Sequence, residues 1–168
     1  MTAPVARPDI TDRADIADRG DIADLVTAFY RRAFADALLG PIFVDVAKVD
    51  MSVHLPVMCD FWETVLLRAG RYHRNALRPH LELNSTVELT AAHFERWLAL
   101  WTATVDERHR GEKAELAKTQ AARIAGSISR RLRGQPATQH VTIQRRRPDE
   151  DSAGRETPGP TRTGSPLV

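Results

Sequence analysis

The chain has 168 residues, a formal net charge of +2 and 42% hydrophobic residues, the composition of one small folded domain with additional polar segments. So small a net charge gives no strong overall attraction to nucleic acid or to a membrane surface. The only cysteine, Cys59, excludes an internal disulfide bond and suits a reducing compartment. No apolar run approaches the roughly 18 residues that span a bilayer, and residues 1–10 contain no apolar signal core. We therefore expect a cytoplasmic protein without a membrane partner.

The N-terminal region leads into an amphipathic helix. Residues 1–20 are predicted to form a flexible extension, in which a six-residue unit beginning with Asp-Ile is repeated. The last copy of that unit continues into a helix whose apolar residues recur at helical spacing from Ile22 to Phe34. Asp21 is the predicted N-cap, because a short acidic side chain can accept hydrogen bonds from the free N–H groups there. Gly40-Pro41 is predicted to end this segment.

The middle of the chain is predicted to hold one long helix and an unusual connector. Residues 42–49 form a short helix or turn, and either Asp50 or Ser52 caps a helix over 53–69. Residues 71–89 are polar and irregular. Since a connector of this length rarely lacks structure, it is expected to be functional or partly helical.

Two more amphipathic helices complete the predicted domain, which spans residues 21–133. Thr90 is the predicted N-cap of the first, which ends before Gly111, and the second spans 112–132. Residues 134–168 are rich in proline and glycine and almost free of large apolar residues, so we expect a disordered tail. Four long amphipathic helices without a competing strand pattern predict an all-α fold.

Candidate functional residues are few, because the common catalytic and metal-binding motifs are absent from this sequence. Tyr30, Trp97 and Trp101 fall on apolar helix faces, where their O–H and N–H groups need partners. Such residues form either an ordinary aromatic core or an apolar pocket with a few aimed donors, and the pattern alone leaves both open. The histidines are the remaining candidates for a ligand: His54, His73, His80, His93, His109 and His140.

Five short motifs occur in a specific order along the chain. They are F-Y at 29–30, L-G-P-I-F at 39–43, H-L-P-x-M-x-x-F-W at 54–62, P-H-L at 79–81 and H-F-x-R-W-L-x-L-W at 93–101. In this order and spacing, they make the chain resemble the third group of the truncated haemoglobins from about residue 21 to residue 132. The resemblance implies a truncated globin fold, a two-over-two helical sandwich around non-covalent haem b (iron protoporphyrin IX). The disordered extensions expected at both ends lie outside the resemblance.

The resemblance also implies a role for individual residues. His80 corresponds to the iron ligand, Tyr30 and Trp97 to polar residues beside the bound gas, and His54 to the distal histidine, with Met58 close to the gas. Arg71, Arg74 and Arg78 are candidate partners of the haem propionates, since arginine pairs well with carboxylates. The candidates for the haem wall, or for the core behind it, are Phe29, Phe43, Leu55, Phe61, Trp62, Tyr72, Leu77, Phe94 and Trp101.

The function implied by the resemblance is binding of oxygen, nitric oxide and carbon monoxide at an iron that can be five-coordinate. We expect redox chemistry rather than simple oxygen delivery. Examples are detoxification of nitric oxide or peroxide by a dioxygenase or peroxidase activity that receives electrons from an electron-donating reductase. Two alternatives stay open at this point. One is a non-catalytic helical interaction module that binds an acidic partner or nucleic acid through the basic tail at Arg145–Arg147, and the other is a haem-based sensor.

Overall fold

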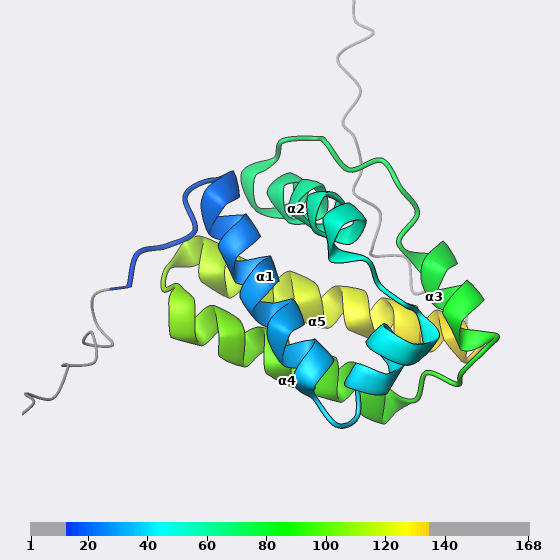
Figure 1. The fold of residues 1–168 in the computed structure, drawn as a ribbon. Helices are drawn as coiled ribbons and strands as arrows, with labels where there is room; N and C mark the ends of the chain where they lie inside the picture. The colour runs from blue at the N-terminus through cyan, green and yellow to red at the C-terminus, as the bar shows by residue number, and fades with distance from the viewer. Residues whose placement is uncertain (1–12, 135–168) are drawn as a thin grey trace, which may run out of the picture.

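The computed structural model describes residues 13–134, which form an all-α domain without strands (Figure 1). The elements are α1 (Arg19–Ala35), the π-helical turn η1 (Pro41–Val46), α2 (Met51–Leu67), α3 (Leu77–Asn84), α4 (Ala91–Arg108) and α5 (Glu112–Leu132). The predicted all-α class and the four long helices are therefore confirmed. Within residues 13–134, no helix combines the length and the apolar character that a membrane crossing needs.

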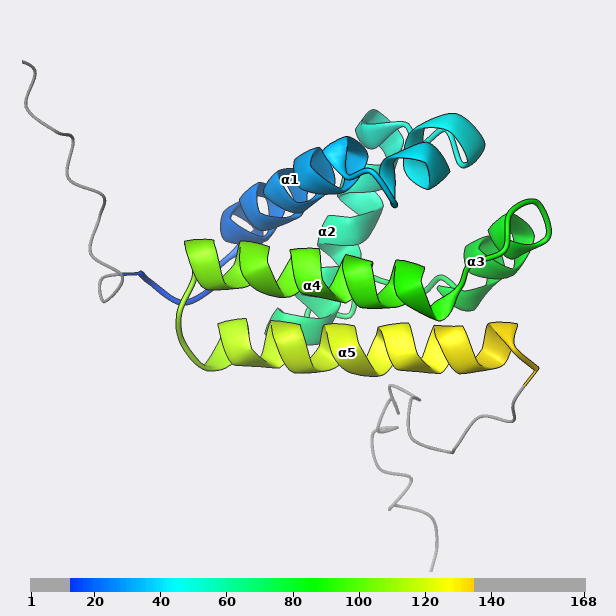
Figure 2. The same cartoon turned by 90° about the horizontal axis from the view of Figure 1, so that it is seen from below.

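The long helices are arranged as two pairs, one stacked on the other. α4 and α5 run side by side as an antiparallel hairpin, and α1 and α2 lie across them (Figure 2). α1 packs on α4, while α2 and the short α3 both pack on α5. This is the expected two-over-two helical sandwich.

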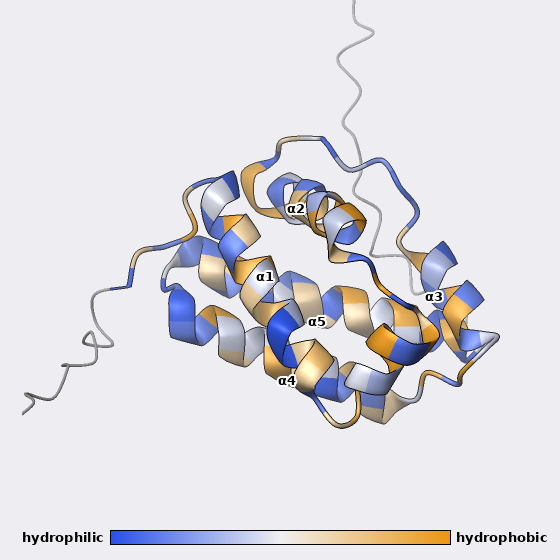
Figure 3. Cartoon of the chain, in the orientation of Figure 1, coloured by the Kyte–Doolittle hydropathy of each residue, from blue (hydrophilic) through white to orange (hydrophobic). Residues whose placement is uncertain are grey.

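The core forms where the apolar stripes of these helices meet. On α1 the buried residues recur three or four positions apart, as a helix with one core-facing side requires. Figure 3 shows hydrophilic residues interspersed with apolar ones on the outward side of α1, and apolar residues on η1. On α5 the buried face is built from small residues, which allow α4 to approach closely: Ala114, Ala117, Ala121 and Ala125.

The start of α1 differs from the prediction. The N-cap is Asp18, whose Oδ1 accepts hydrogen bonds from the N–H groups of Gly20 at 2.7 Å and Asp21 at 3.1 Å. Asp21 is the third residue of the helix, and its carboxylate accepts from the N–H of Ala17 at 2.8 Å. The prediction of Asp21 as N-cap was wrong, because the two aspartates form a reciprocal capping box that starts the helix three residues earlier.

The segment before α1 belongs to the folded domain. Ile16 is 0% exposed and packs in the core, and the carboxylate of Asp15 accepts hydrogen bonds from the N–H groups of Lys113 and Ala114, both at 2.9 Å. These groups lie in the first turn of α5 and have no partner within that helix. The domain therefore begins before residue 21, and residues 13–20 are not a free extension. The predictions for residues 1–12 and 135–168 lie outside the described residues.

The connector between α2 and α4 is partly helical, as expected, because it contains α3. α2 begins at the predicted cap, with Asp50 Oδ1 accepting from Ser52 N–H at 2.9 Å. Its last residue is Leu67 rather than residue 69, because Arg68 adopts a left-handed conformation with φ 57°. The connector therefore leaves α2 at Arg68.

We predict that Asp15→Ala lowers the free energy of unfolding by about 1–2 kcal/mol at neutral pH, because two N–H groups of α5 lose their acceptor. Burial alone would raise the pKa of Asp15, but hydrogen bonds from Lys113, Ala114 and Ile16 lower it below 3.8. A carboxyl with a lower pKa in the folded state stabilises the fold above its unfolded pKa, and this contribution is lost as the pH falls through the folded pKa.

Urea unfolding at neutral pH and near pH 3 measures this contribution, with Asp24→Ala as the control because Asp24 is an exposed carboxylate on α1. The difference between wild type and Asp15→Ala should shrink at the lower pH. An equal loss of stability in the Asp24 variant would show that Asp15 does not act as a cap for α5.

Candidate ligand-binding site

A buried tyrosine and a histidine meet where α1 crosses α2. Tyr30 is 7% exposed, and its hydroxyl lies 2.6 Å from Nε2 of His54. Three phenylalanines surround the tyrosine ring, with centroid distances of 5.1 Å to Phe29, 5.7 Å to Phe34 and 5.7 Å to Phe43. Burial raises the pKa of Tyr30, so the hydroxyl keeps its proton and remains a hydrogen-bond donor.

Trp97 of α4 lies on the other side of the same phenylalanine. The ring of Phe29 makes edge-to-face contacts with Tyr30 at 5.1 Å and with Trp97 at 5.4 Å. Trp97 is half-buried, and none of the hydrogen bonds found among residues 13–134 involves its indole N–H. The fold therefore brings Tyr30 of α1 and Trp97 of α4 to one region, and the indole N–H of Trp97 can donate a hydrogen bond to a ligand.

His80 is positioned by its own helix start. Its Nδ1 lies 2.8 Å from the carbonyl oxygen of Ala76, so Nδ1–H donates there and the lone pair is on Nε2. Burial lowers the pKa of His80, and the bond to Ala76 only partly opposes this effect. Nε2 makes no hydrogen bond to any residue in the described part of the chain. A neutral imidazole with one nitrogen held by a carbonyl and the other nitrogen free is the form that binds a metal.

The two predicted histidines lie within electrostatic range of each other. Burial is the larger cause of the lowered pKa of His54, and a positive charge on His80 would lower it further. Because His54 is on α2 and His80 is on α3, the fold directs imidazoles from two separate helices toward a common region.

Several predicted wall residues are large and only half-buried. Phe61 of α2 contacts Tyr72 of the connector edge-to-face, with ring centroids 5.1 Å apart. Apolar side chains left partly open at the edge of a core can be covered by an apolar ligand. The half-buried members of the predicted set are Phe43, Leu55, Met58, Phe61, Tyr72, Leu77, Phe94 and Trp97.

Trp62 and Trp101 lie deeper than the half-buried residues. They are 4% and 1% exposed, their rings stack 4.3 Å apart, and the indole N–H of Trp101 donates to the carbonyl of Ala117 at 3.3 Å. The sequence left these two tryptophans as candidates for the haem wall or for the core behind it. Their packing supports the core.

Thr64 is a residue at the site that the sequence did not single out. Its hydroxyl donates to the carbonyl of Asp60 at 2.7 Å and accepts from the N–H groups of Arg71 and Tyr72, both at 3.0 Å. These bonds attach the connector to α2 and set Tyr72 against Phe61. A threonine inside a helix commonly bonds to its own helix, so nothing in the sequence indicated that this hydroxyl also accepts hydrogen bonds from the connector.

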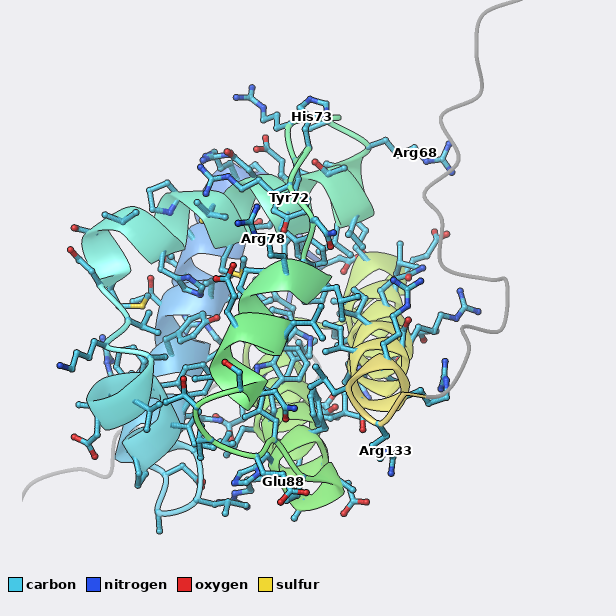
Figure 4. The ribbon with its side chains drawn as sticks, turned by 90° about the vertical axis from the view of Figure 1, so that its right-hand side faces the viewer. Arg68, Tyr72, His73, Arg78, Glu88 and Arg133 are labelled. Carbon is cyan, nitrogen blue, oxygen red and sulfur yellow. The ribbon has the colours of Figure 1, made fainter. Side chains whose placement is uncertain are left out.

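The candidate propionate partners differ in how far they are already paired. Arg71 lies 3.5 Å from the carboxylate of Glu63, and Arg78 pairs with Glu82 at 2.9 Å. Arg74 has no ion pair with any residue from 13 to 134. Figure 4 shows Tyr72, His73 and Arg78 along the connector and the start of α3.

His93, another candidate from the sequence, caps α4 instead. Its Nδ1 accepts a hydrogen bond from the backbone N–H of Thr90 at 2.9 Å. This contact gives His93 a local structural role at the predicted N-cap.

The comparisons agree with this fold. No protein-family model matches the chain. The group 3 truncated haemoglobin ctb of Campylobacter jejuni is 28% identical over 111 residues, which cover 64% of this chain and 85% of that protein. The crystal structure of the group III truncated haemoglobin from Campylobacter jejuni aligns with a TM-score of 0.63 and 27% identity, covering 71% of this chain and 94% of that chain.

The fold is the truncated-globin fold expected from the motifs. The resemblance to group III truncated haemoglobins is confirmed in both sequence and structure. These similarities support a globin-type ligand-binding protein.

We predict that Thr64→Val accelerates amide hydrogen exchange at Arg71 and Tyr72, because both N–H groups lose their acceptor while the shape of the side chain is retained. Thr64→Ser, which keeps the hydroxyl, should restore slow exchange. Thr104→Val is the matched control, since the Thr104 hydroxyl also donates to its own helix, at Leu100 O. Equal exchange in the wild type and Thr64→Val would contradict the role of Thr64 in holding the connector.

Proposed function

We propose that the chain binds haem b non-covalently, with His80 as the metal ligand, and binds diatomic gases beside Tyr30, His54 and Trp97. The observation that carries this proposal is the state of His80. Its Nδ1 is held by the carbonyl of Ala76 at 2.8 Å, and its Nε2 makes no hydrogen bond to any residue from 13 to 134.

The surrounding residues fit a flat apolar group. Haem b held by one histidine supplies an iron with one position open to oxygen, nitric oxide or carbon monoxide. The half-buried side chains of α2, the connector and α4 would cover its apolar faces. Arg74 is exposed and has no ion pair with residues 13–134, so it can bind a propionate without first breaking an ion pair.

The polar residues suit retention of a polar gas more than its rapid release. Tyr30 and His54 are already joined at 2.6 Å in a largely apolar setting, so little reorganisation is needed for one of them to donate to a ligand. Trp97 provides another donor. A charge-assisted hydrogen bond contributes about 1.5–3 kcal/mol, and each 1.4 kcal/mol is about tenfold in affinity.

Slow release favours redox chemistry over oxygen delivery. We therefore propose detoxification of nitric oxide or peroxide, with an electron-donating reductase as a partner. The alternative of an interaction module acting through Arg145–Arg147 concerns residues outside the described range, and no contact in residues 13–134 favours it or a sensor.

We predict that His80→Gly abolishes most haem retention, because the only proposed metal ligand is removed. The Soret band of the purified protein with added haem, and the rate of haem transfer to an acceptor protein, measure this effect. His73→Gly is the control, since His73 is an exposed histidine of the same connector. If wild type takes up no haem, or if both variants retain it equally, the assignment of His80 fails.

We predict that Tyr30→Phe speeds oxygen dissociation by roughly ten- to hundredfold, because one charge-assisted hydrogen bond is lost. Carbon monoxide is less polar when bound, so its dissociation should change much less. Stopped-flow ligand replacement measures both rates, and Tyr72→Phe tests the loss of a phenol hydroxyl from the connector. Equal acceleration for the two gases would contradict a direct hydrogen bond from Tyr30.

A further inference from the structure

The positive charge of the domain is concentrated in two segments. Residues 64–81 contain four arginines and no aspartate or glutamate, and residues 116–134 contain four arginines, one lysine and no acidic residue. The other described segments, 13–63 and 82–115, each hold more acidic than basic residues. The domain is therefore strongly polarised in charge, although its net charge is small.

The fold brings the two basic segments together. α2 and α3, which flank the first segment, both pack on α5, which holds the second. Figure 4 labels Arg68 just after α2, His73 on the connector, Arg78 at the start of α3 and Arg133 at the end of α5. One side of the molecule thus carries charge from residues that are far apart in the sequence.

Many of these arginines are not neutralised by the domain itself. Elsewhere, Arg19 pairs with Asp60 at 2.8 Å and Arg96 pairs with Asp36 at 2.7 Å. On the basic side, five exposed arginines have no ion pair with any residue from 13 to 134, and we call them the arginine face: Arg68, Arg74, Arg123, Arg131 and Arg133.

We propose that the arginine face is a docking surface for the acidic face of an electron-donor protein. Its members lie on the connector, which Thr64 ties to α2, and at α5, which packs against α3, the helix of His80. This inference rests on the proposed function, since it names the partner class for the same site. One electron would pass from the donor's reduced flavin, which is oxidised by one electron, to ferric iron, which becomes ferrous.

The chemistry of the face favours a protein over other anionic partners. Arginine forms bidentate pairs with carboxylates, and it is common at protein interfaces. A membrane surface would need several apolar side chains beside the charges. Leu81 of α3 is exposed on this side, but the other exposed large hydrophobic residues lie elsewhere, at Leu38, Val44, Val46 and Val53. A long nucleic acid would extend past the face onto segments with excess acidic charge, whereas an acidic patch of matching size would not.

The test measures association of the full chain, haem-free and haem-loaded, with flavodoxin, a small acidic flavoprotein, by surface plasmon resonance at low and at physiological ionic strength. Wild type should associate rapidly at low salt and more slowly as salt screens the charges. Arg68→Glu/Arg133→Glu should lower the association rate by about tenfold or more.

The matched control is Arg31→Glu/Arg108→Glu, which makes the same change in net charge at two exposed arginines of α1 and α4. It should change the rate by no more than about threefold, because those residues lie outside the face. Equal slowing by both double variants, or salt-independent association, would overturn the proposal. Tighter binding of a single-stranded oligonucleotide than of flavodoxin would overturn the choice of a protein partner.

The haem-loaded protein adds a second readout, the rate of its reduction by reduced flavodoxin compared with reduction by a small neutral reductant. Only the first rate should fall in Arg68→Glu/Arg133→Glu. If wild type takes up no haem, the proposed function fails, and association of the haem-free chain still decides whether the face docks flavodoxin.

Discussion

The packing of Phe29 at the crossing of α1 and α4 is the constraint on which the site depends. This ring is 1% exposed and makes edge-to-face contacts with Tyr30, Trp97 and Trp101 at 5.1–5.4 Å. Such contacts fix ring orientation as well as distance. Because Tyr30 follows Phe29 on α1 and Trp97 contacts Phe29 from α4, a change in the crossing would separate the two polar groups that are proposed to act on one ligand.

The opposite side of the site is held by polar contacts rather than by a packed core. α3 has no fully buried residue, so the position of His80 depends on the connector before it and on contact with α5. Thr64 and Glu63 attach that connector to α2 at Arg71. A ligand on His80 would add a further tie to this lightly packed helix, so binding and order of α3 should be coupled.

The proposed site and the arginine face share these same elements. The connector carries Arg68 and Arg74 of the arginine face and leads into α3, which carries the proposed metal ligand, whereas the acidic excess lies on other segments. A partner that docks there would be oriented toward the helix of His80 by the field of the protein. Gas retention and electron supply would then be served by neighbouring parts of one surface.

The sequence by itself determined the helical class and the four long helices, because apolar spacing of three to four residues is a local property of each segment. It also predicted either Asp50 or Ser52 as a cap, and grouped Tyr30, His54, His80 and Trp97 through motif resemblance. Only the tertiary structure decided that Asp15 caps a helix about a hundred residues later, and that Thr64 holds the connector. The physical reason is that such hydrogen bonds depend on how helices cross, and short polar side chains carry no local signal of a distant partner.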